Sequence, residues 1–365
     1  MKRLLRIVAI ALAIAVAVAG GYAAYVLIAW HRLPDEDLPA DPGEAYAGEQ
    51  PAPETGREYD IITWNLGFGA YSADYSFFMD GGTESRAFSK DAVLQNIDHA
   101  VDVLRTEDAD FMLLQEVDIA ATRSWQVNEA ERIESALGGF VTFAQNYDSP
   151  YLFYPVTRPH GASKSGLLTL SDCRISRRER RSLPVESGFR KLLDLDRCYS
   201  VSHIPVGNGR ELCLYNLHLS AYTADGAIAT EQLGRMCEDM RAEYGKGNYI
   251  VAGGDFNKDL AGNSGEIFGV SGENYSWAQP LDAGMIPEGL RVVCPLDAAQ
   301  PVPSCRNADT AYVPGKTFVL IVDGFIVSDN VTVADCHVID EGFAASDHNP
   351  VKLTFTLNPE ATEEA

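Results

Sequence analysis

An apolar run opens the chain. Ile7–Trp30 contains no charged residue, and Lys2, Arg3 and Arg6 precede it. About 20 such residues span the hydrocarbon core of a bilayer, whereas the apolar stretch of a cleaved signal peptide is about 7–15 residues long. Gly20-Gly21 could belong to a cleavage site. The length favours a retained transmembrane helix within residues 1–32, with the N-terminus inside and the remainder outside, because basic residues flank the run on its N-terminal side.

Beyond residue 58, short apolar runs alternate with stretches of helical periodicity, which is typical of an α/β domain. Val93, Ile97, Val101 and Leu104, for example, recur with a helical period. The pattern predicts helices over 93–104, 127–137 and 233–244, and strands over 59–64, 109–117, 166–170, 211–219, 249–252, 317–327 and 351–357. No internal repeat or second boundary interrupts this alternation, so residues 59–358 are expected to form one domain.

Two segments lack apolar periodicity. Residues 33–58 contain five prolines and many acidic residues, a composition that predicts an extended, self-repelling spacer. Residues 359–365 are expected to form a frayed acidic tail.

Acidic residues dominate the chain. The formal net charge is -23, and the first 32 residues hold four basic residues and no acid, so the excess lies beyond the apolar run. Such a surface repels polyanions and gains little from counterion release, which counts against tight nonspecific binding of nucleic acid. It does not exclude a nuclease, because a bound divalent metal reverses the sign of the charge locally.

The seven cysteines follow no CxxC or zinc-like spacing. Because seven is an odd number, at least one thiol is unpaired within the chain. Cys237 falls on an apolar helical stripe and is expected to be a buried thiol. Cys294 and Cys305 flank a proline-rich loop and are the best candidates for a disulfide.

Polar side chains recur where the predicted strands end or are interrupted. Taken singly, such an Asp fits a turn or a helix cap, and such a His fits a hydrogen-bonded structural role. Recurrence at six strands instead indicates an oxygen-rich site for a hard divalent cation, with imidazoles left for acid–base work. The side chains concerned are Asn65, Glu116, Asn216, His218, Asp255, Asn257, Asp323, Asp347 and His348.

Six short motifs carry a family resemblance. "TWNLG", "LLQEVD", "YNLHLS", "GGDFNKD", "VDGFIV" and "SDHNPV" occur in this order between Tyr59 and Leu357. Together they resemble the endonuclease/exonuclease/phosphatase superfamily, which includes pancreatic-type deoxyribonucleases, apurinic endonucleases, neutral sphingomyelinases and inositol polyphosphate phosphatases. The resemblance implies a two-sheet α/β sandwich with flanking helices, here preceded by one transmembrane helix.

The resemblance also implies roles for individual residues. Asn65, Glu116 and Asp347 match metal-site positions, with Mg²⁺ expected and Mn²⁺ or Ca²⁺ as alternatives. Asp255 and Asn257 match the GDxN pair that orients the attacking water and contacts the phosphate. His218 matches an upstream His of the deoxyribonuclease and sphingomyelinase branches. Asp323 matches the Asp that pairs with the C-terminal His, here His348.

Three further residues are candidates for substrate contact. Asn216 shares a strand face with His218, Arg123 follows the Glu116 strand, and Lys164 lies in a segment, 157–165, that matches no branch of the family. Packing at a helix start is the alternative for Arg123, and a solvated loop is the alternative for Lys164. Gly324 stands where nuclease members often carry a basic residue, which weakens the case for a DNA substrate.

These features predict a Mg²⁺-dependent phosphoester hydrolase, acting on a phosphodiester, in a single-pass protein of the cell membrane with its domain outside. A lipid headgroup suits the tether and the acidic surface. Extracellular nucleic acid is the alternative, and a soluble phosphomonoester ranks third. A non-catalytic surface binding module is disfavoured because every core position holds a competent residue. No protein partner is predicted.

Overall fold

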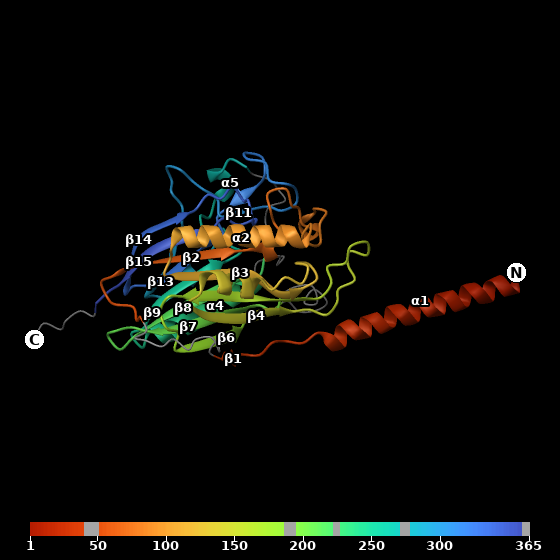
Figure 1. The fold of residues 1–365 in the computed structure, drawn as a ribbon, viewed down its shortest axis with the longest axis horizontal. Coiled ribbons are helices and arrows are strands. Elements are labelled where there is room, and N and C mark those ends of the chain that lie inside the picture. The colour runs from red at the N-terminus through yellow and green to blue at the C-terminus, as the bar shows by residue number, and fades with distance from the viewer. Residues whose placement is uncertain (40–50, 186–194, 222–226, 271–277, 360–365) are drawn as a thin grey trace, which may run out of the picture.

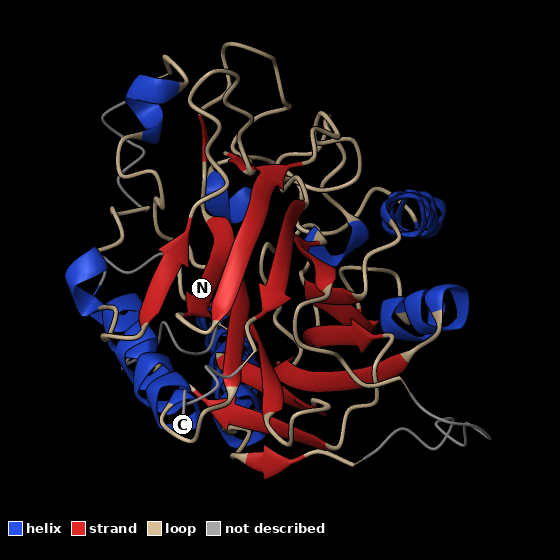
Figure 2. Ribbon diagram, turned by 90° about the vertical axis from the view of Figure 1, so that its left-hand side faces the viewer, coloured by secondary structure: helices blue, strands red, loops and turns tan. Residues whose placement is uncertain are grey.

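Two mixed β-sheets stack face to face in the computed structural model, which describes residues 1–39, 51–185, 195–221, 227–270 and 278–359. Helices cover the outer faces of both sheets (Figure 1, Figure 2). The predicted two-sheet α/β sandwich, preceded by one N-terminal apolar helix, is confirmed.

The first sheet has the strand order β1-β6-β7-β8-β9-β13-β10. Its strands are Glu36–Asp37 (β1), Arg177–Ser182 (β6), Cys198–Pro205 (β7), Glu211–His218 (β8), Tyr249–Asp255 (β9), Leu290–Val293 (β10) and Asp323–Ser328 (β13). The second sheet has the order β14-β15-β2-β3-β5-β4. Its strands are Glu58–Asn65 (β2), Phe111–Ala121 (β3), Phe140–Asp148 (β4), Ser163–Ser171 (β5), Val331–Val338 (β14) and Val351–Leu357 (β15). A small pair, Cys305–Arg306 (β11) and Val319–Leu320 (β12), lies beside them.

Helices α2 (Lys90–Glu107) and α3 (Glu129–Leu137) pack on the second sheet, and α4 (Ala227–Tyr244) packs on the first. Short helical turns are α5 (Ser264–Ile267), η1 (Gly67–Gly69), η2 (Phe78–Asp80) and η4 (Ala283–Met285). Ser89 begins α2 by accepting a hydrogen bond from the Ala92 amide at 3.1 Å, which satisfies one of the free N–H groups of the first turn.

Strand alternation explains the layers. Along β2, Ile61 faces the core between the two sheets, whereas Ile62 faces the core beneath α2. Both side chains are fully buried, so β2 is covered on both faces and reads as a continuous apolar run rather than as an alternating one. On α2, Val93, Ile97 and Leu104 form the buried stripe that the periodicity predicts.

Helix α1 (Lys2–Ala29) runs away from the domain (Figure 1). It is long and apolar enough to cross a membrane, although a signal sequence near the N-terminus would meet the same criteria. Its side chains are exposed except at its C-terminal end, where Val26 is buried.

Most predicted elements are present with small shifts of their ends, including all three helices. The expected strand 317–327 divides into β12 and β13, so that Asp323 begins β13 instead of interrupting a longer strand. Sequence reading missed β4, β6, β7, β10 and β14. In β6 the segment Arg177-Arg178-Glu179-Arg180-Arg181 is polar, and no apolar alternation marks it as a strand.

Part of the expected spacer is bound to the domain. Strand β1 pairs antiparallel with β6, and Arg180 donates from Nη1 to the carbonyls of Leu33 and Pro34 at 2.9 and 2.8 Å. This segment therefore adds an edge strand to the first sheet. The rest of the spacer prediction falls largely on residues 40–50, and the tail prediction on residues 360–365, which lie outside the described residues.

The predicted disulfide between Cys294 and Cys305 is wrong, because all seven cysteines are free thiols. Cys305 is buried in β11, where its Sγ lies 3.5 Å from Nε2 of His348. Tertiary packing has directed this thiol toward a polar site and away from Cys294. Cys237 is a buried thiol on α4, as expected.

Candidate active site

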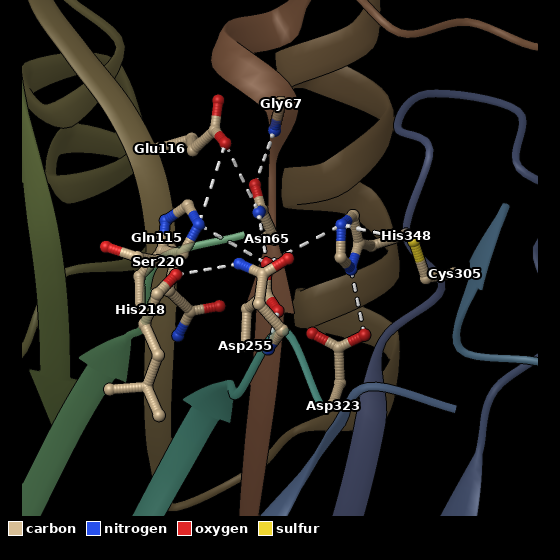
Figure 3. A network of polar contacts seen from close by, with 12 residues as sticks. Asn65, Gly67, Gln115, Glu116, His218, Ser220, Asp255, Cys305, Asp323 and His348 are labelled. Atoms are coloured by element: carbon tan, nitrogen blue, oxygen red, sulfur yellow. Dashed lines mark hydrogen bonds and ion pairs between the residues drawn. The ribbon is translucent and has the colours of Figure 1, made fainter. Parts of the chain in front are cut away.

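Polar side chains from both sheets converge at one end of the sandwich (Figure 3). Asn65, His218 and Asp255 are the last residues of β2, β8 and β9. Strand β8 runs parallel to β9 with His218 opposite Asp255, and β13 begins with Asp323 opposite Asp255 on the other side. The strand registers therefore bring residues that are distant in sequence to one edge.

Glu116 reaches this edge through a bulge in β3. The register of β3 against β5 shifts between Leu114 and Val117, and Glu116 itself has a positive φ of 52°. A left-handed conformation is strained for a residue with a side chain and is typical of functional positions in bulges. The bulge directs the carboxylate of Glu116 toward the amide of Asn65, 3.5 Å away.

Asp255 is the centre of the cluster. Its Oδ2 lies 3.1 Å from Nδ2 of Asn65, 3.4 Å from Nε2 of His218 and 3.7 Å from Nε2 of His348. Its Oδ1 accepts a hydrogen bond from the Asn257 amide at 2.8 Å. Both histidine rings thus lie within 4 Å of one carboxylate oxygen, so the structure brings together the two imidazoles that the motifs place far apart in sequence.

Two glycines allow Asp255 to occupy this position. A Cβ on Gly254 would lie 2.0 Å from the carbonyl oxygen of Leu217, and φ at Gly254 is 153°. A Cβ on Gly253 would lie 2.5 Å from the Phe325 ring. Only glycine fits where β9 lies so close to its neighbours, which gives the GGD sequence a physical reason.

His348 is held by Asp323 from the opposite side. Nδ1 of His348 lies 2.8 Å from Oδ2 of Asp323, and that oxygen also accepts a hydrogen bond from Ser304 at 2.8 Å. The Trp64 indole donates to the His348 carbonyl at 2.8 Å, which fixes the backbone. A carboxylate on Nδ1 leaves Nε2 to face the cluster, where it lies 3.5 Å from the Cys305 thiol.

The two histidines have opposite electrostatic surroundings. Burial, together with the charges of Arg197 and His348, lowers the pKa of His218 well below its ordinary value. Burial would also lower the pKa of His348, but the carboxylates of Asp323 and Asp255 raise that pKa well above its ordinary value. Near neutral pH the site therefore holds a neutral His218 beside a protonated His348, an arrangement that divides acid and base roles.

The carboxyl groups carry excess negative charge. Burial raises the pKa of Glu116, Asp255 and Asp347, while Oδ1 of Asp323 is buried without a hydrogen-bond partner among the described residues. Ligand atoms of Asp255, Asp323 and His348 lie within 4.8 Å of one another. The two carboxylates of this group offer the oxygen donors that a hard divalent cation such as Mg²⁺ prefers, while Nδ1 of His348 is already paired with Asp323.

Asn65 departs from the expected ligand geometry. Its side-chain oxygen accepts a hydrogen bond from the Gly67 amide at 3.0 Å, so its NH₂ group faces Glu116 and Asp255. In this orientation the NH₂ group of Asn65 lies between the carboxylates of Glu116 and Asp255 and contacts both. A rotation of the amide would present its oxygen to a cation and break the contact with Gly67.

Asn216 does not reach the open edge. It is fully buried between the sheets, where its NH₂ donates to the carbonyls of Leu114 and Leu168 and its oxygen accepts from Gln115 at 2.8 Å. The hydrogen bonds to the second sheet tie β8 to β3 and β5. The structure therefore supports a role in joining the sheets and not the substrate contact expected from its strand parity.

Replacing Asn216 by Ala is expected to lower the free energy of unfolding by about 1–3 kcal/mol, because buried partners such as the Gln115 amide lose their hydrogen bonds. Urea denaturation measures this loss. KM for a phosphodiester should stay unchanged. A raised KM with an unaltered denaturation midpoint would instead restore the substrate-binding interpretation.

The other two substrate candidates are engaged elsewhere. Arg123 is buried, forms a bidentate ion pair with Asp118 at 2.8 and 3.1 Å, and stacks over Phe68 with its guanidinium 3.9 Å from the ring centroid. Lys164 is half exposed and lies 3.4 Å from Asp148. These contacts agree with the packing and solvated-loop alternatives.

Sequence reading missed several residues that position the site. Ser304 orients Asp323, and Cys305 contacts His348. Arg197 donates to the Leu219 carbonyl just beyond the end of β8 and affects the pKa of both His218 and Glu116. None of these three stands in a family motif, so only their position in space identifies them.

A second group of metal-ligating side chains lies away from this edge, around the β7–β8 pair. It comprises His203, Glu211, Cys213 and Glu243. Arg177 contacts the His203 ring at 3.1 Å, and Lys246 pairs with Glu243 at 2.7 Å. Protein cations thus already neutralise these carboxylates, in contrast to the cluster at the strand ends.

The chain matches one protein family by sequence. The pattern of the Endonuclease/Exonuclease/phosphatase family aligns with residues 62–348. A search of the curated proteins found no match.

Several solved structures share the fold. An endonuclease/exonuclease/phosphatase from Beutenbergia cavernae DSM 12333 covers 84% of this chain and 73% of its own, with 17% identity and a TM-score of 0.55. One from Bacteroides vulgatus covers 83% and 100%, with 14% identity and a TM-score of 0.53. TDP2 from D. rerio, complexed with a single strand DNA product, covers 82% and 99%, with 16% identity and a TM-score of 0.52. At these identities the likeness concerns the fold alone.

Proposed function

The chain belongs to the endonuclease/exonuclease/phosphatase family, and we propose that it is a Mg²⁺-dependent phosphodiesterase at the outer face of a membrane. Members of the family are metal-dependent hydrolases of phosphoester bonds. The observation that carries the proposal is the convergence of Glu116, Asp255, His218 and His348 at one edge of the sandwich, where Glu116 is partly exposed and the other three side chains are buried. This arrangement provides carboxylate, neutral imidazole and imidazolium around a single point.

In the proposed mechanism Glu116 and Asp347 would hold the cation, with Asn65 beside them. When bound, Mg²⁺ supplies positive charge that stabilises the phosphoryl oxygens and the leaving group as negative charge develops. The raised pKa values of Glu116 and Asp347 support this assignment, since burial outweighs the charges of the nearby cations, Arg123 for Glu116 and His348 for Asp347, and a bound metal ion would offset the rest.

The remaining groups act on water and on the phosphate. Asp255, positioned by Asn65 and the Asn257 amide, aligns a water for in-line attack and accepts its proton. His348, kept protonated by Asp323, faces the phosphoryl group and stabilises the negative charge that develops there. His218, which is neutral, faces the Asp255 carboxylate with Nε2, 3.4 Å away, and donates to it when that nitrogen carries the proton.

We favour a lipid headgroup phosphodiester as substrate. The acidic chain, with its net charge of -23, repels long polyanions, and Gly324 follows Asp323 where nuclease members often carry a basic residue. Nucleic acid is the second candidate, and it is supported by the DNA product bound to the D. rerio TDP2 structure. A soluble phosphomonoester ranks third.

We further propose that α1 is retained as a single-pass anchor within residues 1–32, followed by a spacer over 33–58, a catalytic domain over 59–358 and a short tail. Basic residues before the apolar run orient the domain outward. Protease added to intact cells should release a soluble catalytic fragment. A mature chain that starts after Ala24 and is free in the medium would contradict the anchor.

A substrate panel on the full chain tests the activity. Phospholipid vesicles, DNA, RNA and inositol phosphates are each incubated with Mg²⁺ and with a chelator. We expect metal-dependent turnover of phosphodiesters, fastest on lipid. The proposal fails if no phosphoester is hydrolysed in the presence of metal, or if turnover persists undiminished in chelator.

A further inference from the structure

Exposed apolar side chains gather on one loop beside the apolar helix. Between β4 and β5, the uncharged segment Tyr151–Val156 leaves Tyr151, Phe153, Tyr154 and Val156 exposed by 37%, 52%, 59% and 69%. They are four of the eight large exposed hydrophobic residues that the described chain has beyond residue 30. An apolar patch of this kind marks an interaction surface on a water-soluble domain.

Neighbouring loops extend this patch. Met79 lines the same cavity as Tyr154. The Trp125 indole donates to the Ala87 carbonyl at 2.9 Å, next to the exposed Phe88. Met79 therefore adjoins the loop 151–156, and the segment next to Phe88 is joined to the chain just after this loop by the hydrogen bond from Arg158 to the Ala87 carbonyl at 3.0 Å.

The loop is hydrogen-bonded to α1 through its backbone. The Tyr151 amide donates to the Tyr25 hydroxyl at 3.0 Å, and the Phe153 amide donates to the Tyr22 hydroxyl at 2.8 Å. The Tyr22 hydroxyl also lies 3.2 Å from the Tyr151 carbonyl, to which it donates. In a bilayer every polar backbone group needs a partner within the protein, and these three contacts supply partners for the Tyr151 and Phe153 backbone and for the two tyrosine hydroxyls of α1.

The position of the two tyrosines sets the depth of the loop. Tyr25 and Tyr22 precede Trp30, the C-cap of α1, by five and eight residues, which corresponds to about 8 and 12 Å along a helix. The hydrocarbon core of a bilayer is about 30 Å thick. If Trp30 lies at the interface, where Trp is enriched, the loop backbone reaches the outer half of the apolar layer.

The same loop borders the catalytic edge. Strand β5 pairs antiparallel with β3, with Gly166 opposite Val117 and Ser163 opposite Ala121. The loop before β5 therefore leaves the second sheet at the end where Glu116 lies. In Figure 1 the loop, coloured yellow-green, projects at the end of the domain from which α1 runs away.

We propose that the loop 151–156 inserts into the outer leaflet of the membrane that α1 spans, and thereby holds the catalytic edge against the lipid surface. The inference rests on the proposed anchoring by α1. It adds a second membrane contact, and it gives a lipid phosphodiester direct access to the site, because the headgroups lie at the level of the strand ends.

Depth-dependent quenching tests the insertion. The full chain, with the two partly exposed thiols replaced by Cys294→Ser and Cys336→Ser, carries Val156→Cys, is labelled with a fluorophore there and is reconstituted into phosphatidylcholine vesicles that contain spin-labelled lipid. The control label is at Asn208→Cys, in the exposed turn that precedes β8, at the opposite end of that strand from His218. We expect strong quenching at position 156 and little at position 208. Equal quenching at both positions overturns the proposal.

Activity gives an independent readout. Phe153→Ser with Val156→Ser removes exposed apolar surface and leaves the core intact. Turnover of a vesicle lipid should fall about tenfold or more, because burying each large apolar side chain is worth about 1.5–3 kcal/mol, while turnover of a soluble phosphodiester stays unchanged. Equal loss on both substrates contradicts the role of the loop.

Flotation with the vesicles tests anchoring by α1 separately from insertion of the loop 151–156. A chain that floats without quenching at position 156 retains its anchor and disproves insertion of the loop. A chain that does not float disproves the anchor, and the loop proposal with it. A chain with quenching but no lipid turnover refutes the proposed substrate alone.

Discussion

Replacing Glu116 by Gln is expected to abolish nearly all turnover while the domain stays folded. A catalytic metal supplies several kcal/mol of transition-state stabilisation, and each 1.36 kcal/mol corresponds to a factor of ten in rate, so a loss of about 10³-fold or more is expected. The neutral amide keeps the size of the side chain and removes the charge that we assign to metal binding. Steady-state kinetics over a range of Mg²⁺ concentrations measures the effect.

Although Glu116→Gln should lose turnover, its folding stability at neutral pH should stay the same or increase. Burial raises the pKa of Glu116 in the folded state and outweighs the charges of the nearby cations, so the ionised carboxylate opposes folding once the pH exceeds the unfolded pKa. The penalty is absent in acid and grows as the pH rises toward the folded pKa. Glu116→Gln should therefore unfold at an equal or higher urea concentration at pH 7 without metal.

Glu131→Gln is the matched control. Glu131 is exposed in the first turn of α3 and lies outside the cluster, so its replacement should leave turnover unchanged. Full activity of Glu116→Gln, or activity insensitive to chelator, would refute the metal assignment.

Removing the His348 imidazole is expected to cost about 10²–10⁴ in kcat, the usual effect of deleting a positioned acid–base group. His218→Ala should show a loss in the same range, since Nε2 of each ring lies within 4 Å of Oδ2 of Asp255. Loss of activity in His348→Ala alone would mean that His218 only fills the end of β8.

Asp323 is expected to act through His348. Asp323→Asn should lose less activity than His348→Ala, and the two losses should not add, because one residue positions the other. The Asp323 carboxylate also raises the pKa of His348. Its neutralisation should therefore lower that pKa and shift the pH–rate limb that reports His348 protonation toward acid. A merely structural Asp323 would leave that limb in place.

The pair His337 and Asp335 provides the control for this cycle. Its members lie 2.5 Å apart on β14 and are half exposed. They form the same kind of carboxylate–imidazole contact as Asp323 and His348, but outside the site. His337→Ala and Asp335→Asn should leave the pH–rate profile unaltered. Additive losses for Asp323 and His348 would contradict the coupled mechanism.

The sequence determined those features that depend on local patterns. Helical periodicity placed α2, since Val93, Ile97 and Leu104 form its buried stripe, and an apolar run placed β9 up to Gly253-Gly254-Asp255. The motifs also predicted which polar residues end the strands. Where strands run parallel, as β2 with β3 and β8 with β9, their C-terminal ends meet at one edge, so polar residues at those ends lie close together.

Features that depend on partners distant in sequence were not predictable in this way. Arg178 and Arg180 are buried in β6, where they donate to the carbonyls of Val141 and Gln145 at 2.7 Å. A run of arginines predicts an exposed loop unless buried carbonyl groups are available to accept their hydrogen bonds. The local sequence gives no sign of such acceptors, because they lie on a distant strand. The β1 segment was likewise assigned to a spacer, because the strand with which it pairs, β6, is distant in sequence.

The tertiary structure alone decided three properties of the site. The bulge at Glu116 has no local sequence signal, since its positive φ is imposed by the register of β3 against β5. Asn216 shares a strand face with His218 but lies two residues earlier in β8. It is therefore buried between the two sheets and does not reach the open edge. Cys305 was matched to Cys294 by spacing, but β11 places its thiol against His348. In each case, packing against distant strands overrides the local pattern, because burial requires a partner that only the fold supplies.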